Sequence, residues 1–131
     1  MMYCLDTNTI IYFLKGQGNV SKKLFSKQPS QITIPSLVVY ELEYGVKKSG
    51  HPRRNQNTLE EFLRPFSVLP FDEKVANIAA KIRYDLEKIG TPIGPIDTLI
   101  AATAMANDKT LVTHNVKEFK RVKGLKDEDW F

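Results

Sequence analysis

Short apolar segments alternate with longer amphipathic segments along this chain, and no other feature of the sequence constrains the fold as strongly. Apolar runs of strand length predict β-strands at residues 3–5, 31–35, 67–71 and 110–113. Amphipathic segments predict helices at residues 9–16, 21–28, 36–50, 52–65, 72–90 and 95–108. Because strands that alternate with helices form mostly parallel sheets covered on both faces, the sequence predicts a three-layer α/β/α sandwich.

Several helix ends carry recognisable local signals. Ser36 and Asp72 are expected to be N-caps, because their side-chain oxygens can accept hydrogen bonds from the first free N–H groups of a helix. Gly90 is expected to end the helix that Asp72 begins, and Pro95 fits the first turn of the next helix. Residues 125–131 are expected to close the chain as a tail.

Composition narrows the class of protein. The chain has 131 residues, of which 42% are hydrophobic and 26% charged, and these values predict one globular domain spanning residues 1–131. There is no apolar run of the roughly 20 residues that a membrane-spanning helix needs, and no signal-peptide pattern. Cys4 is the only cysteine, which excludes an internal disulfide and a thiolate metal site. These features favour the cytoplasm.

Polar residues follow the first and last of the expected strands. Asp6 comes directly after the apolar run "YCL", and Asn115 follows "TLVT". The carboxyl ends of parallel strands meet at one edge of a sheet, where ligands of α/β proteins bind. We therefore expect Asp6 and Asn115 to lie near each other at that edge.

Two further acids stand beside apolar positions. Glu41 shares a helix face with Leu37 and Val38, and a buried carboxylate needs a cationic partner. Asp97 lies in the first turn of the most apolar expected helix. Taken singly, Asp6 is explained as a helix cap, Asp97 as an acid favoured by the helix dipole, and Glu41 as the partner of a buried arginine.

Taken together, the three acids converge on one sheet edge. Like charges held close together cannot all remain ionised without a counter-ion. A hard divalent cation such as Mg²⁺ meets this need, because it takes oxygen ligands and is usually held by one or two carboxylates. A metal-free mechanism would use histidines as acid and base, and only His51 and His114 exist, both in polar, loop-like segments.

Four segments resemble a known family. The stretches "LDTN", "YELEYG", "PIGPIDTLIAATA" and "TLVTHNVKEFKRVKGL" occur in the order and spacing of a PIN domain, and they are most similar to VapC, the ribonuclease toxin of bacterial type II toxin–antitoxin pairs. The resemblance runs nearly end to end and includes the "EDW" of the tail.

The resemblance implies roles for individual residues. Asp6, Glu41 and Asp97 match the catalytic, metal-binding acids of the family. Asn115 occupies a fourth position where many PIN domains have an aspartate, which leaves open whether one or two metal ions bind. Further pocket residues are expected at Glu118, Thr7 and Thr113, whose hydroxyls would orient the acids.

The activity implied is hydrolysis of RNA phosphodiesters with Mg²⁺ or Mn²⁺, leaving a 5′-phosphate and a 3′-hydroxyl. The relatives point to tRNA, and more narrowly to the anticodon stem-loop of initiator tRNA. Two basic clusters flank the acids and are candidate phosphate contacts; they comprise Lys47, Lys48, Arg53 and Arg54, and then Lys117, Lys120, Arg121 and Lys123.

The family also implies partners. We expect a homodimer and a cognate VapB-type antitoxin, whose C-terminal segment covers the acid pocket and through which the complex binds operator DNA. Four aromatic residues could contribute either to the antitoxin groove or to the core, namely Tyr12, Phe13, Phe25 and Tyr44.

Three other classes stay open at this stage. A phosphoryl-accepting signalling domain also binds Mg²⁺ among acids at strand ends, but it has paired acids after the first strand and gives Glu41 no role. A haloacid-dehalogenase-type phosphatase needs Asp-x-Asp, and Asn8 stands in the second place. A non-catalytic RNA- or protein-binding domain would not need Asp6, Glu41 and Asp97 together.

Overall fold

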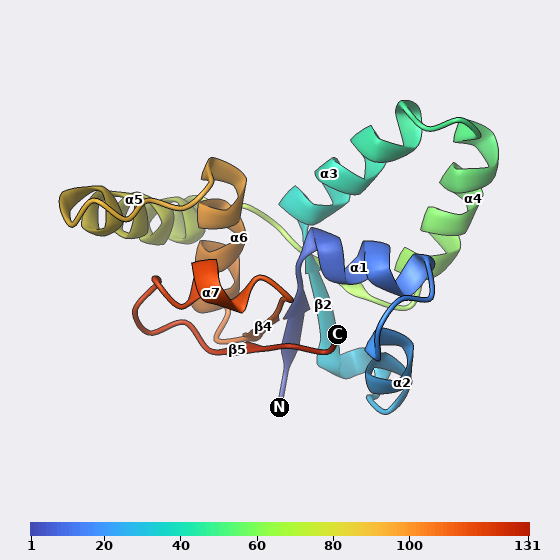
Figure 1. Cartoon of the computed structure of the whole chain (residues 1–131), viewed down its shortest axis with the longest axis horizontal. Helices are drawn as coiled ribbons and strands as arrows, with labels where there is room; N and C mark the ends of the chain where they lie inside the picture. The colour runs from blue at the N-terminus through green and yellow to red at the C-terminus, as the bar shows by residue number, and fades with distance from the viewer.

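The computed structural model describes all 131 residues and contains one five-stranded sheet. Its strands run in the order β3-β2-β1-β4-β5, and every neighbouring pair is parallel (Figure 1). The strands are β1 (Tyr3–Leu5), β2 (Ile32–Pro35), β3 (Ser67–Leu69), β4 (Thr110–Val112) and β5 (Asp127–Glu128). Helices flank this sheet, so the predicted α/β fold with a parallel sheet is confirmed.

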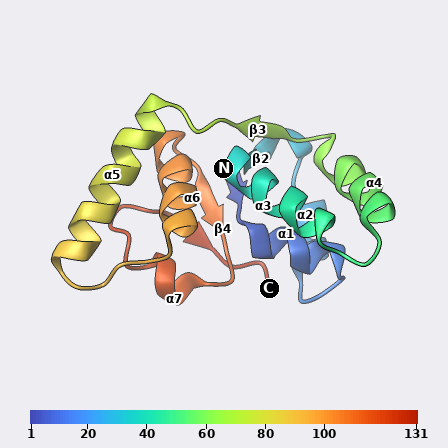
Figure 2. The same ribbon diagram turned by 90° about the horizontal axis from the view of Figure 1, so that it is seen from above.

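Helices fill the connections between strands, as parallel pairing requires. They are α1 (Thr7–Leu14), α2 (Val20–Phe25), α3 (Ser36–Lys47), α4 (Pro52–Leu63), α5 (Glu73–Lys88), α6 (Pro95–Ala106) and α7 (Val116–Phe119). The α3–α4 hairpin and the α5–α6 pair lie at opposite ends of the molecule, with β1, β2 and β4 between them (Figures 1 and 2). No helix combines the length and the apolar character that crossing a lipid bilayer requires.

The structure corrects three local expectations. The tail contains a fifth strand, β5, because Asp127 and Glu128 pair with β4 although their side chains are not apolar. Helix α1 begins at Thr7 rather than at residue 9, since Asp6 already caps it. Ser36 is the first residue of α3 and makes no capping bond; the cap position belongs to Pro35. Asp72 does cap α5, by accepting a hydrogen bond from the Val75 N–H.

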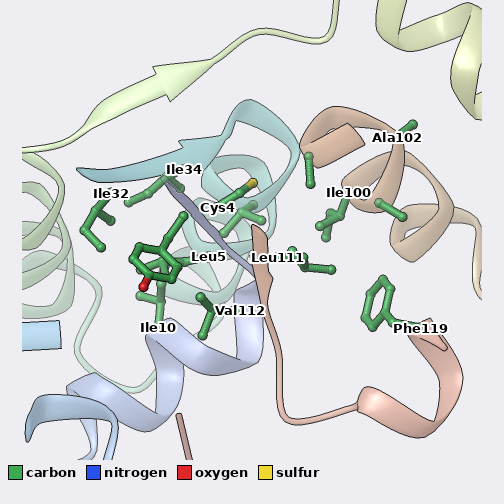
Figure 3. Packing of buried hydrophobic residues seen from close by; sticks show 14 of the residues in the cluster. Cys4, Leu5, Ile10, Ile32, Ile34, Ile100, Ala102, Leu111, Val112 and Phe119 are labelled. Atoms are coloured by element: carbon green, nitrogen blue, oxygen red, sulfur yellow. The ribbon is translucent and has the colours of Figure 1, made fainter. Parts of the chain in front are cut away.

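The three central strands are buried on both faces. Side chains of β1, β2 and β4 interleave with residues from α1, α6 and α7, as Figure 3 shows for Cys4, Leu5, Ile10, Ile32, Ile34, Ile100, Ala102, Leu111, Val112 and Phe119. Cys4 is fully buried and belongs to this core. Dense packing of this kind fixes the positions of the strand ends to which the polar residues belong.

The C-terminal tail is fastened to the loop between α1 and α2. Trp130 is 1% exposed and packs edge-on against Tyr3, with ring centroids 5.1 Å apart. The main-chain oxygen of Phe131 accepts a 2.7 Å hydrogen bond from the Asn19 N–H. Gly18 lies directly beneath it: φ is +64°, and a Cβ there would stand 2.7 Å from the same oxygen.

The replacement Gly18→Ala therefore adds a steric clash to backbone strain. We expect it to lower the free energy of unfolding by about 2 kcal/mol or more, measured by urea denaturation. Gly16→Ala is the matched control, because Gly16 has φ +67° and nothing within 4 Å of its missing Cβ. That variant carries only the strain of the left-handed backbone, about 1 kcal/mol. Equal losses in both variants would show that the tail does not press on Gly18.

Candidate functional site

Asp6 stands where β1 ends and α1 begins. Its N–H donates to the Val112 carbonyl at 3.1 Å, which places it beside the end of β4. Its Oδ1 accepts a 2.8 Å hydrogen bond from the Thr9 N–H, so the expectation of a helix cap is confirmed. Burial raises the pKa of this carboxyl, hydrogen bonds from Thr113 and Thr9 counteract part of that rise, and the charge of Glu41 adds to it. Asp6 is only 5% exposed, and these hydrogen bonds fix its carboxyl group at the sheet edge.

Glu41 reaches the same edge from the second turn of α3. Its Oε1 accepts a hydrogen bond of 2.5 Å from the Thr7 hydroxyl, and Thr7 directly follows Asp6. The sequence predicts a cationic partner for Glu41, but no lysine or arginine of the chain forms an ion pair with it. Glu43 instead faces α4, where Gln56 Nε2 lies 3.4 Å from its Oε2.

Asp97 completes the group from the first turn of α6. Its pKa is raised to about 6, chiefly by burial and then by the charges of Glu118, Asp6 and Glu41. The fields of the acids therefore overlap. The ion pairs of the structure all lie elsewhere and involve Lys81–Asp85, Arg83–Glu87, His114–Asp129 and Lys126–Asp108. Asp6, Glu41 and Asp97 repel one another with no cationic side chain to balance them.

Asn115 and Glu118 are brought to this edge but are bonded to each other. Asn115 Nδ2 donates to Glu118 Oε2 at 2.8 Å, and the Gly94 N–H donates to Glu118 Oε1 at 3.1 Å. These two bonds, the first more than the second, lower the pKa of Glu118. Glu118 thus links α7 to the residue before α6, three positions from Asp97. The sequence predicts Asn115 and Glu118 as pocket residues. It does not predict the hydrogen bond between Glu118 and the Gly94 N–H. The only local signal for this contact is the Gly94-Pro95 pair at the start of α6.

The donors at this edge suit a hydrated hard cation. No three Asp, Glu, His or Cys side chains stand close enough together to form a ready-made cage around an ion. Mg²⁺ does not require one, because it keeps several waters and is bound directly by one or two carboxylates. Softer ligands are not offered: burial raises the pKa of Cys4 to about 12, and His114 Nδ1 lies 3.0 Å from Asp129 Oδ2. The uncompensated acids therefore fit a divalent cation with oxygen ligands.

The predicted basic residues lie at the surface on two sides of the acids. Lys47 and Lys48 end α3, and Arg53 and Arg54 belong to the first turn of α4. Lys117 lies on the short helix α7, next to α6 (Figure 1). These five side chains are exposed, as are those of Lys120, Arg121 and Lys123, and none of the eight takes part in an ion pair.

The four aromatic residues considered for a partner groove have different surroundings. Tyr12 contacts the rings of His114 and Phe131, whereas Phe13 contacts those of Phe25 and Phe62. Phe25 is 76% exposed and Tyr44 is 57% exposed, so core packing accounts for neither.

The raised pKa of Asp97 makes stability depend on pH. The folded protein holds this proton more tightly than the unfolded chain does, so ionising Asp97 lowers stability; the loss develops as the pH rises from about 4 to about 6 and is complete above that. Asp97→Asn removes the charge. In EDTA we expect this variant to exceed the wild type at pH 8 by about 1 kcal/mol, a value reduced for solvent screening of a half-exposed group.

Urea denaturation at pH 4 and pH 8 measures the effect. The advantage of Asp97→Asn should disappear at pH 4, where the wild-type carboxyl is protonated. Asp85→Asn on α5 is the control, because Asp85 is exposed and forms an ion pair with Lys81, so the change removes an attraction and not a repulsion. An Asp97→Asn protein less stable than the wild type at pH 8 would contradict mutual repulsion among the acids.

Comparison with known proteins identifies the family. The model of the PIN domain matches residues 3–125. The tRNA(fMet)-specific endonuclease VapC of Salmonella typhimurium is 37% identical over 130 residues, covering 99% of this chain and 98% of the relative. Ribonuclease VapC2 of Rickettsia felis is 39% identical over 133 residues, with the same coverage.

Solved structures agree with these relatives. VapBC from Salmonella typhimurium bound to DNA has a chain that superposes with a TM-score of 0.94 at 37% identity, over 100% of this chain and 99% of that one. VapBC2 from Rickettsia felis, bound to a DNA fragment from its promoter, gives a TM-score of 0.91 at 39% identity over the full length of both chains. The chain therefore belongs to the PIN-domain family and, within it, to the VapC ribonucleases.

Proposed function

We propose that this chain is a Mg²⁺-dependent endoribonuclease that cleaves tRNA and acts as the toxin of a type II toxin–antitoxin pair. The observation that carries the proposal is the group formed by buried Asp6 and half-buried Glu41 and Asp97, which has no cationic side chain to balance it. Burial and the charges of Glu118, Asp6 and Glu41 together raise the pKa of Asp97 to about 6. Repulsion of this kind among carboxylates is typical of functional sites, and binding of a divalent cation would relieve it.

The residues of the chain divide the work of hydrolysis. Asp6, fixed by the Thr9 N–H, and Glu41, held by the Thr7 hydroxyl, would hold the ion. Mg²⁺ or Mn²⁺, when bound, supplies Lewis-acid chemistry that activates water and balances the negative charge of the attacked phosphate. Asp97 would also contact the ion, and it would accept the proton of the attacking water, since burial and the neighbouring charges raise its pKa to about 6, close to neutrality. Because water attacks, the products carry a 5′-phosphate and a 3′-hydroxyl.

The proposed substrate is tRNA, and within it the anticodon stem-loop of initiator tRNA. The name of the Salmonella typhimurium relative, tRNA(fMet)-specific endonuclease, supports this choice. Phosphate contacts are assigned to the exposed cations on either side of the acids, which are Lys47, Lys48, Arg53, Arg54 and Lys117. Their lack of acidic partners leaves all five free to bind a polyanion.

The proposed partners are a second copy of the chain and a VapB-type antitoxin that covers the acids and carries the complex to operator DNA. The DNA-bound VapBC structures from Salmonella typhimurium and Rickettsia felis support this assignment. An apolar hollow of about 480 Å³ between α1, α3 and α4 has Glu41 in its wall and would accept an antitoxin segment. We further propose that residues 1–131 act as one domain, in the cytoplasm, where tRNA is found.

Purified protein incubated with total tRNA and Mg²⁺ tests the activity. We expect cleavage at a limited number of sites, with 5′-phosphate ends, and complete loss of cleavage in EDTA. Asp6→Ala and Asp97→Asn should each lower the rate by at least about 100-fold, because each removes a ligand of the ion. Asp85→Asn, on the surface of α5, should cleave like the wild type.

Two results would contradict the proposal. Cleavage that persists in EDTA would exclude a metal-dependent reaction. Stable uptake of phosphate on Asp6 from a small phosphoryl donor, without cleavage of any RNA, would identify a phosphoryl-accepting signalling domain instead.

A further inference from the structure

Helix α3 presents an exposed aromatic ring beside one of the site acids. Tyr44 follows Glu41 by three residues, so the two side chains are neighbours on the helix surface. Its side chain is 57% exposed. The Lys48 ammonium lies 4.9 Å from the centre of the ring and belongs to the same face, one turn further along. Glu41, Tyr44 and Lys48 therefore form a stripe that runs from the acids to the basic end of α3.

The aromatic–lysine pair by itself marks no site, and the chain contains the comparison. Tyr84 on α5 is 64% exposed, and Lys88 lies 6.0 Å from its ring centre at the same four-residue spacing. What distinguishes Tyr44 is its position. Tyr84 belongs to α5, which lies at one end of the molecule (Figures 1 and 2) and contributes no acid to the site. Tyr44 instead adjoins Glu41 on α3.

The chemistry around Tyr44 fits a nucleotide. On the C-terminal side of Tyr44 along α3, positive charge for phosphates comes from Lys47, Lys48, Arg53 and Arg54. On its N-terminal side lies Glu41, one of the acids that would hold the ion at the scissile bond. A base that adjoins this bond can lie flat on an exposed aromatic ring, and such stacking tolerates any base because every base has a π-face. Tyrosine and arginine are common in protein interfaces as well, but lysines are depleted from their centres, so Lys47 and Lys48 beside the ring favour an anionic ligand.

We propose that Tyr44 is a base-stacking residue: an unpaired nucleotide of the RNA, adjacent to the bond that is cut, lies on its ring while Lys48 contacts the neighbouring phosphate. This inference rests on the proposed nuclease function and adds a structural preference to it. A base within a duplex has no free face to offer, so the Tyr44 ring favours cleavage in loops and other single-stranded segments.

Kinetics on a short RNA hairpin with Mg²⁺ test the role. We expect Tyr44→Leu to lower kcat/KM by roughly 10-fold, the size of a lost base–aromatic stack. Tyr44→Phe keeps the aromatic face and should restore kcat/KM to within about 3-fold of the wild type. Tyr84→Leu is the matched control and should behave like the wild type. The same substitutions assayed on a fully paired RNA duplex should differ little from one another.

A binding measurement separates stacking from a general effect on structure. A hairpin with 2-aminopurine in its loop, mixed with the Asp97→Asn protein so that it is not cut, should lose fluorescence on binding when the base stacks. Adding Tyr44→Leu to that background should abolish the quenching, and adding Tyr84→Leu should not.

Three outcomes would overturn the inference. The first is equal kcat/KM for Tyr44→Leu and the wild type on the hairpin. The second is equal loss in Tyr44→Leu and Tyr84→Leu. The third is a change of oligomeric state in Tyr44→Leu by sedimentation, which would make this face an interface between copies. Each of these outcomes is measured against an active wild-type enzyme, so it refutes the role of Tyr44 alone. A wild-type protein that cuts no RNA would instead refute the proposed nuclease function.

Discussion

Parallel pairing of β1 with β4 is the constraint from which the arrangement of the site follows. The hydrogen bond from the Asp6 N–H to the Val112 carbonyl sets the ends of the two strands side by side. Asp6 and Thr113 are therefore neighbours although more than a hundred residues separate them in the chain. Thr113 in turn accepts a hydrogen bond from the Asn115 N–H, which fixes the turn that leads into α7. Strand pairing, and not any loop, positions the first acid.

The site combines firm support with unrelieved repulsion. Asp6 and Glu41 are each held by hydrogen bonds from neighbouring threonines or backbone N–H groups, so they cannot move apart freely. Asp97 has no such partner, and its pKa is raised to about 6. An arrangement of this kind lowers the stability of the protein without metal, and the proposed cation would relieve the repulsion among the acids on binding. The nearby Glu118 differs, since both its oxygens are already bonded within the chain.

Much of this could be predicted from the sequence, for physical reasons. The four longer strands and the chief helices follow from hydrophobic periodicity, and Asp6, Glu41 and Asp97 stood out because each is an acid beside apolar neighbours. The two-residue strand β5 could not be predicted, since Asp127 and Glu128 lack strand-like side chains and their place in the sheet comes from backbone pairing with β4. The bond between Asn115 and Glu118 and the exposure of Tyr44 were equally invisible. Both depend on how α6, α7 and α3 pack, which periodicity does not specify.

A crystal of the protein grown with Mn²⁺ would show whether the three acids share a metal ion, because anomalous scattering locates the ion without reference to any activity. We expect one peak at the carboxyl edge of the sheet, within coordination distance (about 2.1 Å) of carboxylate oxygens from one or two of Asp6, Glu41 and Asp97, with any remaining acid reached through water. An anomalous map empty at this edge, with the three carboxylates turned toward lysines, arginines or backbone amides, would contradict it.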